Sequence, residues 1–182
     1  MRDAADTYCS GKQPELETGR LRVVALTPRQ MVWWLTNLSR LEREMGCTYR
    51  GEPLTGRFRE IVAWQAERAC RDETNFMWHG FWFIVRKEDR AVVGSADFKD
   101  VPNDRGEVEI GYGLGRAFEG NGYMTEAVRA MCAWAKEQPG VRRILAETEL
   151  DGLASQRVLK RCGFRERERG ETVWWSLSNE LG

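Results

Sequence analysis

The sequence of 182 residues contains a single histidine, His79, and no pair of cysteines in a Cys-X-X-Cys arrangement. A metal site built from histidines or cysteines therefore has too few ligands, and a nucleophile–histidine relay has one candidate base. The five cysteines are odd in number and widely spaced. This usage is typical of reduced thiols in a cytoplasmic protein and not of a disulfide framework. We expect a cytoplasmic protein without a metal.

An excess of charge of either sign is also missing. Lysine and arginine together number 28, as do aspartate and glutamate, so the formal net charge is zero. No overall field then attracts nucleic acid or an anionic membrane surface. The chain has no run of about 18 apolar residues, the length that a membrane-spanning helix needs, and residues 1–19 lack the apolar segment of a secretory signal. We expect neither a nucleic-acid partner nor a membrane association.

Hydrophobic residues make up 42% of the chain and charged residues 31%, which is typical of a globular domain. We predict one domain over residues 1–182, in which residues 1–17 form a flexible extension. Thr27 as N-cap and Pro28 at the first helical position predict a helix that continues to Gly46. We expect further helices at 52–71, 124–136 and 154–163, and strands at 20–26, 81–87, 91–99, 107–114, 141–150, 164–167 and 172–177. The order β-αα-βββ-α-β-α-ββ predicts an α/β fold (an α+β mixed sheet) with helices on both faces.

The stretch EIGYGLGRAFEGNGYMTEA, residues 109–127, concentrates glycine between a predicted strand and a predicted helix. The first amides of a helix have no partner inside the helix, and the helix dipole makes this end slightly positive. Gly120 and Gly122 carry no side chain, so an anion can approach these amides. The stretch predicts a phosphate or pyrophosphate site at the amides of Gly120 to Thr125. The alternative is that the glycines only form a tight turn.

Two motifs resemble a known family. The segment FEGNGYMTEAVRAM resembles the phosphate-loop signature Q/R-x-x-G-x-G/A of the GNAT N-acetyltransferases, in the GxGYxTEA form of the branch that contains the ribosomal-protein-alanine acetyltransferases. The segment ASQRVLKRCGF resembles the second signature of that branch, and both motifs stand in the order of the family. The resemblance covers roughly residues 18–177. It implies the GNAT acyl-CoA N-acyltransferase fold and acetyl-CoA as the co-substrate.

The resemblance also implies where the coenzyme lies. In GNAT folds two central strands splay apart and the pantetheine inserts between them, which places it beside the backbone of Tyr112, Gly113 and Leu114. The residues that would surround the pyrophosphate are Glu119, Gly120, Asn121, Gly122, Tyr123, Met124 and Thr125. Two of these depart from the signature. Glu119 replaces the usual glutamine or arginine, and Met124 replaces a small residue.

Acetyl transfer needs a neutral amine, so a general base is expected. Glu109 resembles the catalytic glutamate of the histone-acetylating branch, and Glu107 shares its strand face by the period of two. The alternative for Glu109 is a surface carboxylate or an ion-pair partner. The tyrosine that serves many GNAT enzymes as general acid corresponds to Leu159 here and is absent. Ser155 resembles the residue that approaches the thioester sulfur, unless it is an ordinary serine at a helix start.

The acceptor side of the site offers aromatic and acidic candidates. Trp33, Trp34 and Tyr49 lie where GNAT enzymes shape the acceptor site, although core packing is the alternative for each of these rings. Glu147 and Glu149 share a strand face and could bind a cationic amine. Alternatively they could form ion pairs with Arg20, Arg22 or Arg143.

Together these features predict an N-acetyltransferase that transfers an acetyl group from acetyl-CoA to a primary amine by direct attack in a ternary complex. The acceptor is a small molecule or a protein N-terminus, and a homodimer is possible. The rival hypothesis is a catalytically weak or inactive acetyl-CoA-binding module that serves as a sensor or scaffold.

Overall fold

The computed structural model describes residues 13–179, so most of the N-terminal extension that we expected at residues 1–17 lies outside the described range. Its last part does not form an extension. Residues Glu15–Glu17 form strand β1, antiparallel to β2 (Leu21–Ala25), with Leu16 opposite Val23. Leu16 packs against the main core, which explains why this segment joins the sheet.

The helices and strands follow the predicted order with a few additions. The remaining strands are β3 (Thr48–Tyr49), β4 (Phe81–Arg86), β5 (Ala91–Phe98), β6 (Glu107–Leu114), β7 (Arg143–Glu149), β8 (Arg165–Arg169) and β9 (Thr172–Ser178). The helices are α1 (Pro28–Thr36), α2 (Leu38–Met45), α3 (Gly56–Arg71), α4 (Phe76–His79), α5 (Tyr123–Glu137) and α6 (Leu153–Arg161), with 3-10 turns at Glu73–Asn75 and Arg116–Phe118. The predicted mixed sheet with helices on both faces is confirmed.

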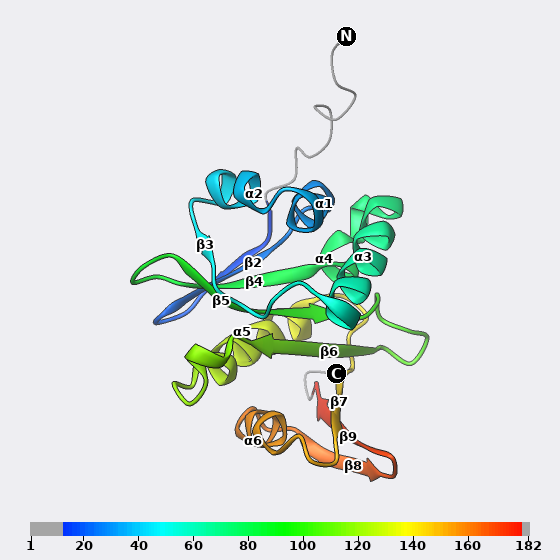
Figure 1. Cartoon of the computed structure of the whole chain (residues 1–182). Coiled ribbons are helices and arrows are strands. Elements are labelled where there is room, and N and C mark those ends of the chain that lie inside the picture. Colours follow the sequence, from blue (N-terminus) through cyan, green and yellow to red (C-terminus); the bar gives the residue numbers. More distant parts are fainter. Residues whose placement is uncertain (1–12, 180–182) are drawn as a thin grey trace.

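The strands form one sheet in the order β1-β2-β4-β5-β6-β7-β9-β8, with β3 added beside β5. Most neighbours are antiparallel, whereas β6 and β7 are parallel because α5 connects them as a crossover. Figure 1 shows α1, α2 and α3 on one side of β2, β4 and β5, and α5 close to β6. Two separate cores result, one under α1, α2 and α3 and one between the sheet and α5.

The single helix that we predicted from Thr27 to Gly46 is two helices. Its start is confirmed, since Thr27 and Gln30 form a reciprocal capping box. The chain then leaves the helical conformation at Asn37, whose side chain accepts a hydrogen bond from Arg40 N and so caps α2. Asparagine competes for backbone amides in this way, which is why it favours a helix start over a helix interior.

Among residues 13–179, none of the helices combines the length and the apolar character that a membrane span requires.

Helix α2 offers a matched test of the packing. Leu41 is fully buried in the core under α1 and α3, whereas Leu38 in the same helix is 36% exposed. We expect Leu41→Ala to lower the free energy of unfolding by about 2–5 kcal/mol through lost burial and a residual cavity. Leu38→Ala should cost far less. Chemical denaturation of both variants checks this, and similar losses in both would contradict the described packing.

Candidate functional site

The parting of two neighbouring strands defines the site. Strand β6 pairs with β7 over Glu107–Glu109, opposite Arg143–Leu145, and the described residues contain no further pair between these strands. On its other edge β6 remains paired with β5 from Ile110 to Leu114. Figure 1 shows β7, β9 and β8 turning away from β6. The sheet therefore opens directly beyond Glu109.

Backbone groups of β6 face this opening. Lys99 N donates to Glu109 O at 3.0 Å, and Gly115 N donates to Val93 O at 2.8 Å, so the odd-numbered residues of β6 direct their backbone groups to the β5 side. Because backbone groups alternate along a strand, those of Tyr112 and Leu114 point toward the gap. An extended ligand with amide groups can pair with this edge as a strand would.

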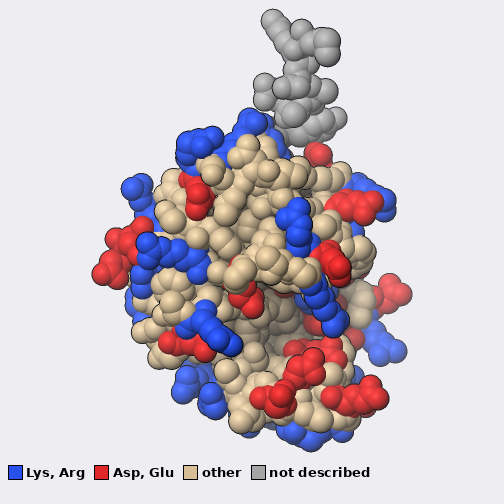
Figure 2. All heavy atoms as spheres, viewed as in Figure 1, with Lys and Arg blue, Asp and Glu red and all other residues tan. Residues whose placement is uncertain are grey.

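A cleft of roughly 410 Å³ follows the opening. It is lined by the end of β6, the glycine loop, the start of α5 and the first turns of α6, together with Glu52 from the loop before α3. Figure 2 shows the surface hollowed above the part that carries α6 and β8, with acidic side chains bordering the hollow. All of the expected coenzyme residues except Asn121 line this cleft, namely Tyr112, Gly113, Leu114, Glu119, Gly120, Gly122, Tyr123, Met124 and Thr125.

The glycine loop presents bare backbone at the start of α5. Gly120 and Gly122 both have φ of +78°, a conformation that side chains other than glycine rarely adopt. Gly122 is the N-cap and provides no side-chain cap, so the first-turn amides of α5 have no acceptor within the helix. A Cβ at Gly120 would contact nothing within 4 Å, which shows that the space above the loop is open. These features fit a phosphate group.

The two departures from the signature leave the loop accessible. Met124 is buried in the main core and does not fill the loop. Glu119 is exposed. The pKa of Glu52 is raised mainly by the burial of Glu52 itself, and the nearby charge of Glu119 raises it further. Asn121 closes the turn, since its side-chain nitrogen donates to Phe118 O and Glu119 O, both at 3.1 Å.

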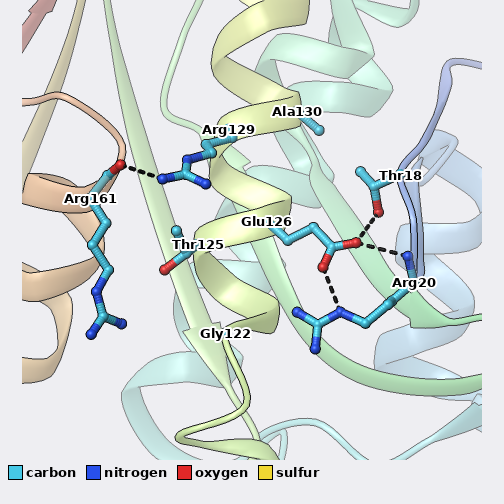
Figure 3. Close-up of a pocket in the computed structure, with 8 residues that line it drawn as sticks. All are labelled: Thr18, Arg20, Gly122, Thr125, Glu126, Arg129, Ala130 and Arg161. Atoms are coloured by element: carbon cyan, nitrogen blue, oxygen red, sulfur yellow. Dashed lines mark hydrogen bonds and ion pairs between the residues drawn. The ribbon is translucent and has the colours of Figure 1, made fainter.

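A second hollow of roughly 620 Å³ adjoins the loop and shares Gly122, Thr125 and Arg161 with the cleft. Figure 3 shows how its arginines lie: Arg129 donates to Arg161 O, and Arg20 binds Glu126 on the opposite side. Arg20 also donates to Asn121 O at 2.9 Å, which ties the loop to the N-terminal part of the sheet. The end of the cleft at the glycine loop, where a phosphate would bind, is therefore flanked by arginine side chains.

Charged side chains cover the α3-facing side of the sheet where the strands part. Lys99 follows β5 directly opposite Glu109, and Asp97 lies opposite Gly111. The Lys99 ammonium contacts Asp97 at 2.9 Å, and Gln65 of α3 donates to Asp97 at 2.7 Å. Asp97 is only 2% exposed, and its carboxylate is held by these two partners.

Glu109 has the electrostatics of a proton acceptor. Burial raises the pKa of Glu109, Lys99 opposes this effect, and the charges of Glu147 and Asp97 add to it. A carboxylate with a raised pKa accepts a proton more readily than an exposed one. Glu107, which shares the strand face of Glu109, is not available as a substitute base. Its carboxylate binds Arg143 at 3.1 Å and Arg167 at 3.4 Å, and it is buried.

The alternative for Glu147 and Glu149, ion pairs with Arg20, Arg22 or Arg143, is not what the structure shows. Arg143 binds Glu107, while Arg20 and Arg22 bind Glu126 and Glu15. Glu147 is exposed and accepts a hydrogen bond from Thr172 Oγ1 at 2.6 Å. Glu147 is two residues after Leu145, which lies opposite Glu109, so its side chain is on the same face of the sheet as that of Glu109.

Ser155 lines the cleft from the first turn of α6, and its backbone oxygen accepts a hydrogen bond from the Tyr112 hydroxyl at 3.0 Å. This bond joins β6 to α6 across the opening. Leu159, at the position where the resemblance would place a tyrosine, is fully buried. Ser155 is therefore the hydroxyl of α6 that faces the cleft within the described residues.

The aromatic residues expected at the acceptor site do not line the cleft. Trp34 is buried among Tyr49, Phe58, Phe81 and Phe83, and Trp33 is buried between the guanidinium groups of Arg29 and Arg40. Packing against β4 and α3 accounts for this, because these rings complete the second core.

Tyr49 contributes indirectly through a residue that the sequence did not single out. Its hydroxyl donates to Glu52 O at 2.6 Å, and the Glu52 carboxylate lies against Gly113, where a Cβ would be 2.0 Å from Glu52 Oε2. Glu52 sits in an irregular loop, so neither periodicity nor spacing marks it. The glycine at 113 was the available signal, because close approach by another group is one reason for glycine in a strand.

Comparison with known proteins identifies this arrangement as that of an acetyltransferase. Residues 24–165 match the family model of the acetyltransferase (GNAT) domain. The chain is 30% identical over 151 residues to the uncharacterized N-acetyltransferase YjdG of Bacillus subtilis (strain 168), covering 82% of this chain and 88% of that protein. It is 27% identical over 107 residues to the [ribosomal protein uS5]-alanine N-acetyltransferase of Escherichia coli (strain K12), covering 57% and 54%.

The fold is shared with the ribosomal L7/L12 alpha-N-protein acetyltransferase RimL, solved in complex with coenzyme A. The TM-score is 0.65 at 14% identity, and the alignment covers 91% of this chain and 98% of that chain. The chain belongs to the GNAT acetyltransferases and is an acetyl-CoA-dependent N-acetyltransferase.

The charge beside Glu109 can be tested by titration. Because the Lys99 ammonium lowers the pKa of Glu109, Lys99→Met should move that pKa upward. The variant also removes the ion pair between Lys99 and Asp97, and the uncompensated charge of Asp97 raises the pKa of Glu109 further. The measurement is a pH titration of the Glu109 carboxyl carbon by NMR, with Lys87→Met as the control. An unchanged or lower pKa in Lys99→Met would contradict the described geometry.

Proposed function

We propose that the cleft between β6 and β7 holds acetyl-CoA with its acyl end at Glu109, and that the enzyme acetylates the primary amine of a small cationic molecule. The observation that carries this proposal is the parting of β6 from β7 directly beyond Glu109. The unpaired edge of β6 lines one cleft with the glycine loop, and this edge begins directly after the half-buried carboxylate of Glu109.

The residues of the cleft fit the coenzyme from one end to the other. The first-turn amides of α5 and the loop from Glu119 to Thr125 would hold the pyrophosphate, with Arg161 nearby. Tyr112 and Leu114 would bind the pantetheine amides through backbone groups. Acetyl-CoA supplies the activated acyl group. Because the pyrophosphate end lies at the loop, the other end points along β6 toward Glu109.

The chain's own groups then carry the proton transfers. An alkylamine is mostly protonated near neutral pH and must lose a proton before it attacks, and Glu109 is placed to accept that proton. Ser155, which lines the cleft, would donate a hydrogen bond to the leaving sulfur, directly or through water. Direct attack within a ternary complex requires both ligands to be bound together.

The charge around Glu109 supports a cationic acceptor. The negative charges of Glu147 and Asp97 contribute to the raised pKa of Glu109. A further carboxylate, Glu52, lies over Gly113, four residues along β6 on the same face. Carboxylates that outnumber the nearby lysine favour an ammonium group. The alternative is a protein N-terminus, which is favoured by the similarity to an enzyme that acts on ribosomal protein alanine. As the cysteine usage indicates, we place the enzyme in the cytoplasm, and a homodimer remains compatible with the fold.

The role of Glu109 has a direct kinetic test. Glu109→Gln keeps the shape of the side chain and removes the base, so we expect kcat to fall by about 10²-fold or more. Coenzyme A affinity measured by calorimetry should not change, because the pyrophosphate end is remote from this residue. Glu137→Gln, an exposed change on α5, is the matched control.

The same experiment separates the enzyme from a coenzyme-binding sensor or scaffold. A wild-type chain that binds coenzyme A yet releases no thiol with any member of an amine panel would contradict the catalytic assignment. Full activity in Glu109→Gln would show that another group takes the proton.

The unusual Glu119 gives a prediction of opposite sign. An exposed carboxylate beside the diphosphate is unfavourable, so Glu119→Gln should tighten coenzyme A binding by about two- to fivefold at low ionic strength. The gain should shrink as salt is added. Calorimetry on this variant and on Glu137→Gln checks the effect, and weaker binding would mean that the Glu119 side chain contacts the coenzyme favourably.

A further inference from the structure

The enzyme carries a primary amine of its own at the place where strands β6 and β7 part. Lys99 N donates to Glu109 O at 3.0 Å, so the two residues are direct cross-strand neighbours with side chains on the same face. This face is the one covered by Gln65 of α3 and not the one covered by α5. Lys99 therefore shares its surroundings with the proposed base.

The ammonium group of Lys99 lies over the backbone of Gly111. A Cβ built at Gly111 would be 2.8 Å from Lys99 Nζ and 2.8 Å from Asp97 Oδ1. Only a glycine at this position allows the amine to approach β6 so closely. Asp97 Oδ2 binds Nζ at 2.9 Å and holds it there. Gly111 is the second residue after the last β6–β7 pair, so the amine lies beside the point where the two strands part.

This is also the end toward which the acyl group of the coenzyme points in the proposed function. The pyrophosphate loop lies at Gly120–Thr125, and the pantetheine arm would run along Leu114, Gly113 and Tyr112 toward Gly111. An amine over Gly111 with a carboxylate beside it reproduces the arrangement that an external acceptor needs.

We propose that Lys99 is a self-acetylation site: in the absence of an external amine, its Nζ takes the acetyl group from acetyl-CoA bound to the same chain. The proposal rests on the proposed function, because the bound acetyl-CoA is the donor.

The step balances without a further reactant. The Lys99 ammonium first transfers one proton to the Glu109 carboxylate. The neutral Nζ then forms a bond to the acetyl carbon, and the bond from this carbon to sulfur breaks. The electron pair leaves with sulfur, which takes up the proton that the attacking nitrogen loses, so the products are an N-acetyl-lysine and coenzyme A as a thiol.

Lys87 and Lys160, two exposed lysines among the described residues, lie in other surroundings. Lys87 binds Glu17 at 3.1 Å and Thr18 O at 2.6 Å at the far edge of the sheet. Lys160 lies over the ring of Trp175. Acetylation by general chemical reactivity would modify such exposed lysines as readily as Lys99, so selectivity distinguishes a built site from adventitious modification.

Acetylation would change the acceptor side of the site. It replaces the ammonium beside Asp97 and Glu109 with a neutral amide, so the local charge becomes more negative and the pKa of Glu109 rises. The modified enzyme should therefore need a higher pH for full activity.

The test is a time course of the intact chain with acetyl-CoA and no acceptor, followed by trypsin digestion and mass spectrometry. Trypsin cleaves after unmodified Lys99 but not after the acetylated residue, so acetylation converts peptide 91–99 into peptide 91–105. We expect Lys99 to be acetylated at least about tenfold faster than Lys87, at a rate independent of protein concentration, and at least about tenfold more slowly in Glu109→Gln. Intact-mass spectra of Lys99→Arg should lack the added acetyl group.

Three results would overturn the inference: no acetyl group on Lys99, acetylation no faster than at Lys87, or a rate that rises with protein concentration. Coenzyme A binding and turnover of the amine panel are measured on the same preparation. Normal binding and turnover with unmodified Lys99 refute self-acetylation alone, whereas absence of coenzyme A binding refutes the proposed function as well.

Discussion

The site depends on the short pairing between β6 and β7, which ends at Glu109. An unpaired strand edge inside a protein is costly unless another group satisfies it. Here the parting is held open by structure on both sides. Val108 and Ile144 anchor the paired ends in the core, and Trp175 donates to Thr148 Oγ1 at 3.0 Å, fixing β7 to β9 as they turn away. The gap is therefore a feature of the fold and provides a preformed partner for an extended amide-bearing ligand.

The same parting organises the charges. On the face toward α3, Gln65, Asp97 and Lys99 form a connected row that ends beside Glu109. Gln65 Oε1 has no hydrogen-bond partner among the described residues, although the residue is fully buried. Burying a carboxylate is costly unless it is paired, and Asp97 is paired with both Gln65 and Lys99. On the other face the Tyr112–Ser155 bond joins the strand to α6. The cleft thus separates an acidic acceptor side from a coenzyme side with a basic flank.

Much of this architecture follows from local signals in the sequence. The capping box at Thr27 and Gln30, the alternation of β6 and the glycine-rich start of α5 are set by neighbouring residues, and each was predictable. The break at Asn37 was missed because apolar periodicity continues across it while a single side chain ends the helix.

Long-range partners were not predictable. The binding of Glu107 by Arg143 and Arg167, the burial of Trp34 and the position of Glu52 over Gly113 each depend on residues brought together only by the sheet. The candidate base and the coenzyme loop could be predicted from the motifs, whereas the acceptor side could be described only from the three-dimensional structure.

The most direct test of the account is amide hydrogen exchange along β6 with and without coenzyme A. If the pantetheine pairs with the open edge, exchange at Tyr112 and Leu114 should slow on binding, together with the amides from Gly120 to Thr125. The amides of Gly111 and Gly113, which face β5, should change less. Coenzyme A binding that leaves Tyr112 and Leu114 unprotected would place the ligand elsewhere and contradict the central claim that the parted strands form its site.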